Sequence, residues 1–414
     1  MVPVHTTLFY IIVAIIVIEA VWDFILDLLN RSSWADEVPE QLNDVYPQEK
    51  FLQQKAYRSD NFRFGWISSL FSLLAILTLL WVYGFAWLNQ WVGAISTHWL
   101  WQPLLFFAFI GLGSILISLP FSIYSTFVIE QKFGFNKTTP KVFVGDLIKS
   151  TLVGAIIGGV LLSLVIWFYQ WAGNLFWLYA WVVLSIFMIF FSKFYTTLIL
   201  PLFNKLKPLE ERELRSAIER MSTKAEFKLE NVFIMDGSKR STKSNAFFSG
   251  FGKNKKIVLF DTLIAELSTE EIVAVLAHEI GHFKLKHIIT GTVLGVLQSG
   301  LMLFLLGWFV NHPEISKALG VDSPTFHIGL LGFGLLYTPL SAIIGLGMTL
   351  LSRRHEFQAD AFAAKYSEAH FLQSALKKIS ASALSNPTPH PWYVFFHYSH
   401  PPLLSRLKAL DKQQ

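Results

Sequence analysis

The chain has 414 residues, of which 53% are hydrophobic, 15% are aromatic and only 15% are charged. A typical soluble domain carries about 25% charged residues, so this composition excludes an ordinary soluble protein and indicates an integral membrane protein. The sequence has no cysteine, which excludes disulfides, thiolate metal ligands and a cysteine nucleophile. The formal net charge is +5, and basic loops between membrane spans account for it without a nucleic-acid partner.

Several apolar runs are long enough to cross a hydrocarbon core of about 30 Å, which takes about 20 helical residues. The first run carries three acidic residues at intervals of four and lacks a basic start, so it is predicted to be a mature span rather than a signal peptide. These residues are Glu19, Asp23 and Asp27, and they share one helix face. Seven spans are predicted, at about 7–29, 65–92, 102–128, 149–171, 175–201, 288–311 and 327–351.

Lysine and arginine gather in every second loop. The loops at about 30–64 and 129–148, the segment 202–287 and the tail 352–414 are basic, whereas the intervening loops carry almost no Lys or Arg. Because basic loops stay on the cytoplasmic side, the N-terminus is predicted to lie outside or in a lumen and the C-terminus in the cytoplasm. The membrane would be a bacterial inner membrane or the endoplasmic reticulum.

The pattern divides the chain into four parts. Residues 1–201 hold five spans, 202–287 form a cytoplasmic insertion, 288–351 hold two more spans, and 352–414 form a cytoplasmic tail. The insertion begins with an amphipathic helix at 208–224. Three short apolar stretches then predict a small sheet, at 229–236, 243–252 and 256–260. The predicted fold is an all-α integral membrane protein with a small α+β cytoplasmic portion.

The insertion ends in a helix with the chemistry of a metallopeptidase. Ser268 and Glu271 have the spacing of a capping box, and His278 and His282 then lie four residues apart on one helix face, where both rings can bind one zinc ion. Glu279 can accept a proton from the water in the open coordination position. Alternatively, His282 caps or pairs with Glu279 on a solvated helix without a metal.

The tail supplies a candidate third ligand. Glu356 and Asp360 lie four residues apart on one predicted helix, and the topology returns this helix to the membrane face of the histidines. Glu356 would bind the metal, and Asp360 would accept the free N–H of a metal-bound imidazole. The alternative is that both carboxylates pair with nearby basic residues on a solvated helix.

A second polar cluster follows at Phe396–Pro402, with Arg406 beyond it. A metallopeptidase needs donors for the oxyanion that forms when water attacks a carbonyl, and His400 and Arg406 could supply them. The alternative is a proline-ordered loop whose His and Arg pair with surface carboxylates.

These residues resemble the Ste24-type CAAX prenyl proteases of peptidase family M48. The resemblance rests on the HExxH segment, on Glu356 to Asp360, on Asn245-Ala246-Phe247, on Ser399 to Pro402, and on Thr126 to Thr139. The segment Thr126 to Thr139 is the most specific of these, because generic zinc proteases do not carry it. The similarity runs from the first span to Arg406.

The resemblance implies seven helices that enclose a large water-filled chamber, a zincin-like cytoplasmic portion, and one zinc ion at the cytoplasmic end of the chamber. His278, His282 and Glu356 would bind zinc, and Glu279 would be the general base. Asn245 and Ala246 would line an edge strand that pairs with an extended peptide, while His400 and Arg406 would stabilise the oxyanion and position the substrate. A water-filled interior would also accommodate the acidic face of the first span.

The implied activity is zinc-dependent hydrolysis near the C-terminus of prenylated CaaX proteins, removing the last three residues. In a bacterium the substrates would instead be membrane or misfolded proteins. The peptide or prenylated protein and the lipid bilayer are therefore the expected partners, and no nucleic acid is expected. The alternatives are a seven-helix transporter or receptor, or a non-proteolytic membrane scaffold, with an inert HExxH motif.

Overall fold

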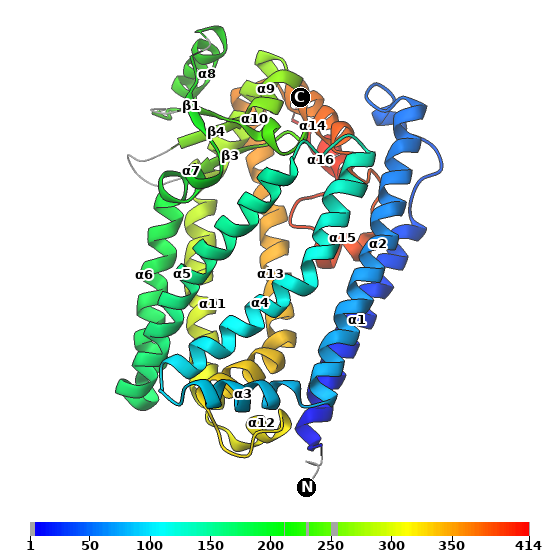
Figure 1. Cartoon of the computed structure of the whole chain (residues 1–414). Helices are drawn as coiled ribbons and strands as arrows, with labels where there is room; N and C mark the ends of the chain where they lie inside the picture. Colours follow the sequence, from blue (N-terminus) through cyan, green and yellow to red (C-terminus); the bar gives the residue numbers. More distant parts are fainter. Residues whose placement is uncertain (1–4, 211, 229–231, 250–255, 414) are drawn as a thin grey trace.

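Long apolar helices form the body of the molecule, and a small sheet with shorter helices caps one end of them (Figure 1). The computed structural model describes residues 5–210, 212–228, 232–249 and 256–413. The helix α1 begins at the end of the bundle that is opposite to the cap and to the C-terminal helices (Figure 1). The long helices are α1 (Thr7–Ser32), α2 (Gln48–Trp81), α4 (Trp101–Tyr124), α5 (Pro140–Ala172), α6 (Phe176–Leu198), α11 (His287–Phe309) and α13 (Phe326–Tyr366).

Within the described residues, six helical segments are long and apolar enough to cross a membrane. One of them, Pro140–Phe203, is 64 residues long and contains the two predicted spans 149–171 and 175–201. It is divided at Gly173, which caps α5 with a φ of 54°, and α6 then packs against α5. The short helix α7 (Leu200–Phe203) closes this segment. The number of seven crossings stays a prediction.

The prediction of one unbroken span at 65–92 is wrong. The helix α2 ends at Trp81, and Tyr83 adopts a left-handed conformation with a φ of 53° before α3 (Gly84–Ile95) begins. A Cβ on Gly84 would lie 2.8 Å from Cδ2 of Leu79, so a larger residue would require the Leu79 side chain to shift. Helices α3 and α12 (Pro313–Ala318) lie at the end of the bundle opposite the cap (Figure 1). Both sides of the break are apolar, so hydropathy alone does not reveal it.

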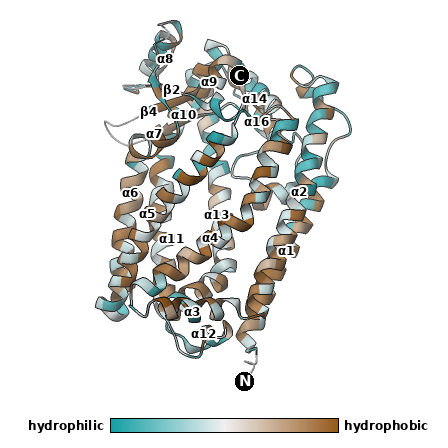
Figure 2. Cartoon of the chain, viewed as in Figure 1, coloured by the Kyte–Doolittle hydropathy of each residue, from teal (hydrophilic) through white to brown (hydrophobic). Residues whose placement is uncertain are grey.

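Apolar side chains cover much of the outside of the long helices (Figure 2). Ile18, Leu116, Ile156 and Trp308 are each more than 60% exposed, which suits helices whose surroundings are lipid. The three acidic residues of α1 line one pocket of about 660 Å³ between α1 and α2. Three serines of α2 line the same pocket, namely Ser68, Ser69 and Ser72. The acidic face therefore adjoins polar groups, while the enclosing chamber stays a prediction.

The cap contains a four-stranded sheet in the order β1, β2, β4, β3. Its strands are β1 (Leu206–Pro208), β2 (Val232–Met235), β3 (Ala246–Ser249) and β4 (Lys256–Phe260), and only the β2–β4 pair is parallel. The three predicted strands contain β2, β3 and β4, whereas β1 has no counterpart in the prediction. Parts of the predicted strands, at 229–231 and 250–252, lie outside the described residues. The strand β3 forms one edge of the sheet.

The helix α10 (Thr269–Lys284) runs through the core of the cap, between α13, α14 (Ala369–Ser382) and α8 (Arg212–Lys224). It begins at the predicted capping box, in which Ser268 accepts from the backbone of Glu271 and Glu271 accepts from the backbone of Ser268. The short helix α9 (Asp261–Glu266) directly precedes α10. The apolar face of α10 is fully buried, with Leu276, Ala277 and Ile280 all 0% exposed.

Small residues bring α10 and α13 into close contact. A Cβ on Gly281 would lie 3.1 Å from Cβ of Phe362 and 3.2 Å from Cα of Ala359, and Ala359 and Ala363 are fully buried. The helix α13 is 41 residues long and runs from the last predicted span into the cap. The predicted span 327–351 and the predicted ligand helix are therefore parts of one helix. The chain ends with α15 (Pro391–His397) and α16 (Leu403–Asp411).

Candidate metal centre

The helix α10 carries two histidines whose Nε2 atoms face each other. The Nε2 atoms of His278 and His282 lie 3.1 Å apart, one helical turn from each other. The left-handed Lys286, with a φ of 62°, separates α10 from α11, so the histidines lie just before a membrane helix begins. Both histidines therefore stand where the cap meets the bundle.

Glu356 of α13 completes the cluster, as the sequence predicts. Its Oε1 lies 3.2 Å from Nε2 of His282, and its Oε2 lies 3.5 Å from Nε2 of His278. One ligand atom from each of the three residues fits within 4.8 Å of the other two. The approach of Gly281 to Ala359 sets this distance, because it fixes the separation of the two helices that carry the ligands.

The cluster has the properties of a metal site. Two imidazoles and a carboxylate are a ligand set that zinc accepts. Oε2 of Glu356 is buried without a hydrogen-bond partner, although buried polar atoms are nearly always satisfied. Burial opposes a charge on His282, but the neighbouring Glu356 outweighs this effect and raises the pKa of His282. The same negative charge would stabilise a metal cation among these three side chains.

Asp360 fixes the ring of His278. Its Oδ1 lies 2.8 Å from Nδ1 of His278, so a neutral imidazole donates Nδ1–H there and leaves Nε2 free as a ligand. Arg406 of α16 in turn donates two hydrogen bonds to Asp360, at 2.8 and 2.6 Å. Arg406 is only 9% exposed and its pKa is raised, because burial opposes its charge less than Asp360 favours it. Arg406 therefore binds Asp360, the carboxylate that orients the predicted metal ligand His278.

His282 has a comparable support that the sequence analysis missed. Its Nδ1 lies 3.1 Å from Nδ1 of His287, and Nε2 of His287 lies 3.0 Å from Oε1 of Gln358. Donation along this chain from His282 to Gln358 leaves Nε2 of His282 free. The ring of His355 stacks on His287 with 3.8 Å between the ring centroids. His287 lies five residues after the HExxH motif, a spacing that could have drawn attention to it.

Glu279 lies beside the cluster and is partly buried. Burial raises the pKa of its carboxyl group, as does the nearby Glu356, while His278 and His282 oppose the rise. A carboxylate with a raised pKa binds a proton more readily, which suits a group that accepts and then returns one. The role of Glu279 as the general base stays a prediction.

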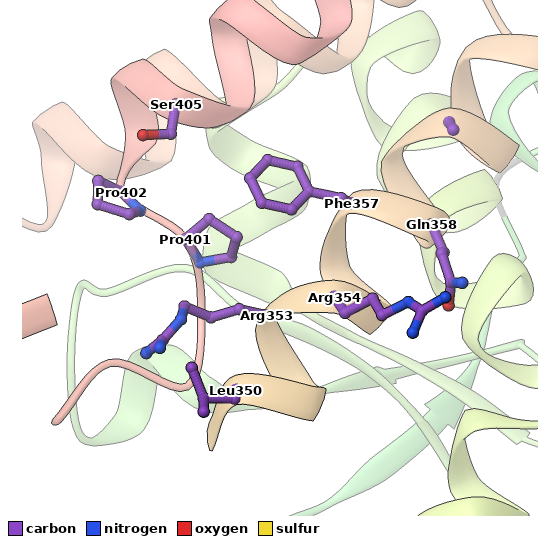
Figure 3. A pocket seen from close by; sticks show the side chains of 9 residues that line it. Leu350, Arg353, Arg354, Phe357, Gln358, Pro401, Pro402 and Ser405 are labelled. Atoms are coloured by element: carbon purple, nitrogen blue, oxygen red, sulfur yellow. The ribbon is translucent and has the colours of Figure 1, made fainter. Parts of the chain in front are cut away.

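The predicted residue His400 reaches the site from the connection between α15 and α16. Its Nε2 lies 3.4 Å from Oε1 of Glu356, yet its side chain is 65% exposed and can face a bound substrate. Arg353 holds this connection by donating to the carbonyl oxygens of Val394 and Tyr398. A pocket of about 570 Å³ lies against this connection, where Phe357 of α13 points toward Pro401 (Figure 3).

The predicted substrate-binding residues lie where β3 begins. Asn245 is exposed, and its Oδ1 accepts from the backbone N–H of Ala246, the first residue of the strand. Among the described residues, β3 pairs only with β4, so its other edge offers backbone groups to a peptide. Packing between β3 and α10 places this edge strand next to the helix that carries the histidines.

Fold and site together define an integral membrane metallopeptidase. A family model described as "CAAX prenyl protease N-terminal, five membrane helices" matches residues 28–205, and the model of peptidase family M48 matches residues 208–414. The chain belongs to peptidase family M48, in its CAAX prenyl protease branch. It is a multi-pass membrane metalloendopeptidase, and the transporter, receptor and scaffold alternatives are not favoured.

Relatives in several kingdoms match most of the chain. CAAX prenyl protease 1 homolog of Arabidopsis thaliana is 37% identical over 97% of this chain and 96% of its own length. The Homo sapiens homolog is 35% identical over 90% of this chain and 88% of its own length. The crystal structure of S. mikatae Ste24p superimposes with a TM-score of 0.92 at 33% identity, covering 98% of this chain and 99% of that one.

Proposed function

We propose that this enzyme is a zinc-dependent endopeptidase that removes the last three residues of prenylated CaaX proteins. The main support for zinc-dependent hydrolysis is that ligand atoms of His278, His282 and Glu356 lie within 4.8 Å of one another. The names of the relatives, CAAX prenyl protease 1, support the substrate class. One zinc ion per chain would bind to these three side chains.

Zinc bound there would polarise the scissile carbonyl and acidify a water molecule. Glu279 accepts the proton of the attacking water and passes it to the leaving amine, for which its raised pKa is suitable. Asp360 and the chain through His287 keep the two imidazoles in the tautomer that binds a metal.

His400 and Arg406 take different roles in this proposal. The exposed ring of His400 beside Glu356 is free to donate to the oxyanion. Arg406 is buried on Asp360 and lies 3.5 Å from Oε2 of Glu356, so it positions these two carboxylates rather than the substrate. The substrate peptide would pair with the free edge of β3 at Asn245 and Ala246.

The catalytic cap would face the cytoplasm of a cell, with the N-terminus outside or in the lumen. The basic loops support this orientation, and α1 begins at the end of the bundle opposite the cap. Because the sequence has no cysteine, single cysteines introduced near His98 and near Glu226 would report their side of the membrane without background. Labelling of the cap position from the lumenal side would contradict the proposal.

A cleavage assay with matched peptides tests the function. A farnesylated CaaX peptide should be cut three residues from its C-terminus much faster than its unprenylated counterpart, and a zinc chelator should stop the reaction. The purified protein should contain one zinc per chain, and Glu356→Ala should lose it, because a ligand is gone. Equal rates for the two peptides would rule out the proposed substrate class, and zinc retained by Glu356→Ala would rule out the ligand set.

A further inference from the structure

The segment Thr126 to Thr139 is the most specific part of the sequence, yet it lies outside the metal centre. It begins in a π-helical turn, Ser125–Glu130, at the end of α4, and it leads into the N-cap of α5 at Thr139. Such π-turns often occur at functional sites. The contacts of this segment lead to the loop 237–245, which directly precedes the edge strand β3.

Glu130 joins the membrane helices to that loop. Its Oε1 accepts from the hydroxyl of Tyr57 on α2 at 2.5 Å, and its Oε2 accepts from Nζ of Lys243 at 2.9 Å. Lys243 also donates to the hydroxyl of Tyr57 at 3.1 Å and lies 4.4 Å from the ring centre of Phe135. Burial opposes the charge of Lys243, but these hydrogen bonds outweigh it and raise the pKa of Lys243.

Backbone contacts hold the same loop from the same segment. Asn136 and Ser241 form a β-bridge, and the carbonyl oxygen of Arg240 accepts from the N–H of Lys137 and from the hydroxyl of Thr138. The guanidinium of Arg240 donates two hydrogen bonds to Asp146 of α5, at 2.7 and 2.9 Å. The loop is therefore tied to the bundle at residues 240, 241 and 243.

The tie at Lys243 lies next to the strand that would bind substrate. Lys243 is two residues before Asn245, and its carbonyl oxygen accepts from the hydroxyl of Thr262 on α9 at 3.1 Å. Two residues further along the chain, the carbonyl oxygen of Asn245 accepts from the N–H of Phe260 on β4. The backbone entering β3 is thus held between the membrane bundle and the sheet.

We propose that Glu130, Tyr57 and Lys243 are positioning residues that hold the edge strand β3 ready to pair with the substrate peptide. The inference rests on the proposed pairing of substrate with β3. A peptide that adds a strand to a sheet binds more tightly when the edge is already ordered, because less conformational entropy is lost on binding. Loss of the contacts among Glu130, Tyr57 and Lys243 should weaken substrate binding and leave metal binding and the chemical step unchanged.

The test compares Glu130→Gln, Lys243→Met and the double variant in peptide cleavage. We expect KM to rise about 5- to 20-fold with kcat within about twofold, since one charged hydrogen-bond pair is lost. Because both variants break the same Glu130–Lys243 pair, the double variant should be much less impaired than the sum of the two single effects. The charge-reversed variant Glu130→Lys/Lys243→Glu should recover part of the loss, which a general folding defect would not allow.

Lys132 provides the matched control. It lies in the same segment and also pairs with α2, through Asp60 at 2.6 Å, but this exposed pair does not reach the loop 237–245. Lys132→Met should leave KM unchanged. If KM in Glu130→Gln equals that of Lys132→Met, or if kcat and zinc content fall while KM stays constant, the inference is wrong.

Hydrogen exchange of the uncleaved protein separates this inference from the proposed function. Backbone amides of residues 244–249 should exchange faster in Glu130→Gln than in Lys132→Met, with zinc affinity equal in both. This result does not depend on which peptide is cut. If the wild-type enzyme prefers another substrate, the proposed function is wrong, but faster exchange in Glu130→Gln would still support the positioning role of Glu130, Tyr57 and Lys243. If exchange is unchanged in Glu130→Gln, the positioning role is wrong, whatever the substrate.

Discussion

The catalytic cap and the membrane bundle use apolar side chains in opposite ways. In the cap, Leu276, Ile280 and Ala359 are 0% exposed, whereas in the bundle Ile156 of α5 and Leu116 of α4 are 65% and 68% exposed. The cap buries its apolar groups because water surrounds it, and the bundle turns many of them outward because lipid is as apolar as they are. Exposure of a large apolar residue therefore has a different meaning in each region.

The two regions also differ in where their polar groups meet. The cap concentrates buried polar side chains around one cluster, where Asp360, Arg406 and Glu356 are each less than 10% exposed. At its cap end the bundle contributes polar contacts in which Glu130 and Asp146 bind residues of the loop before β3. The bundle thus supports the cap as well as spanning the membrane.

The largest expected effect separates chemistry from folding within the cap. Glu279→Gln should lower kcat by about 10²- to 10⁴-fold, because it removes the proton acceptor. It removes no ligand, so zinc content and thermal unfolding should match the wild type. Cleavage of the farnesylated CaaX peptide, together with metal analysis, provides the measurement. Turnover near the wild-type rate would show that another group takes the proton.

The next effect tests the meaning of exposure in the bundle. Ile156→Asp should destabilise the protein by about 2.5–3.5 kcal/mol, because it places a carboxylate against lipid. Leu52 provides the control, since it is 56% exposed on the polar first half of α2. There Leu52→Asp should change stability by less than about 0.5 kcal/mol. Thermal unfolding in nanodiscs measures both, and equal effects would contradict the contrast between the two regions.

The smallest effect concerns the N-terminus of α10. Burial opposes the charge of Glu271, but hydrogen bonds from Lys378, Ser374 and the backbone of Ser268 lower its pKa below the ordinary value of 4.5. A lowered pKa stabilises the fold above the pKa of the unfolded chain, and this stabilisation is lost as the pH falls through the folded value. Glu271→Gln should therefore cost about 1 kcal/mol at pH 7 and less below pH 4.5.

Thermal unfolding at several pH values would check this prediction. Glu270→Gln provides the control, because Glu270 is the exposed neighbour on the same first turn. A pH-independent loss in Glu271→Gln would mean that packing rather than charge explains the effect.

Much of the site could be predicted because its residues lie on regular helices. The capping box at Ser268 and the four-residue separation of His278 and His282 define a helix and its metal-binding face from local sequence alone. The family is confirmed by models that cover residues 28–205 and 208–414. The roles of His400, Asn245 and Ala246 stay predictions, although the structure places them beside the cluster or at the edge of the sheet.

Other features escaped prediction for physical reasons. The break at Tyr83 lies within an apolar run, so hydropathy carries no signal for it. The support of His282 by His287 and Gln358 joins residues that are 71 positions apart. The attachment of Arg406 to Asp360 depends on where α16 docks against α13, which sequence spacing does not state.

The sequence by itself determined that the chain enters a membrane, which helix carries the two histidines, and which family it belongs to. The first two properties follow from composition and from helical periodicity, which are local, whereas the family follows from the resemblance of the motifs and is shown by the family models. Only the tertiary structure decided that Glu356 reaches both histidines, that Arg406 is committed to Asp360, and that Glu130 binds Lys243. Those contacts join separate helices, and their distances depend on packing such as that of Gly281 against Ala359.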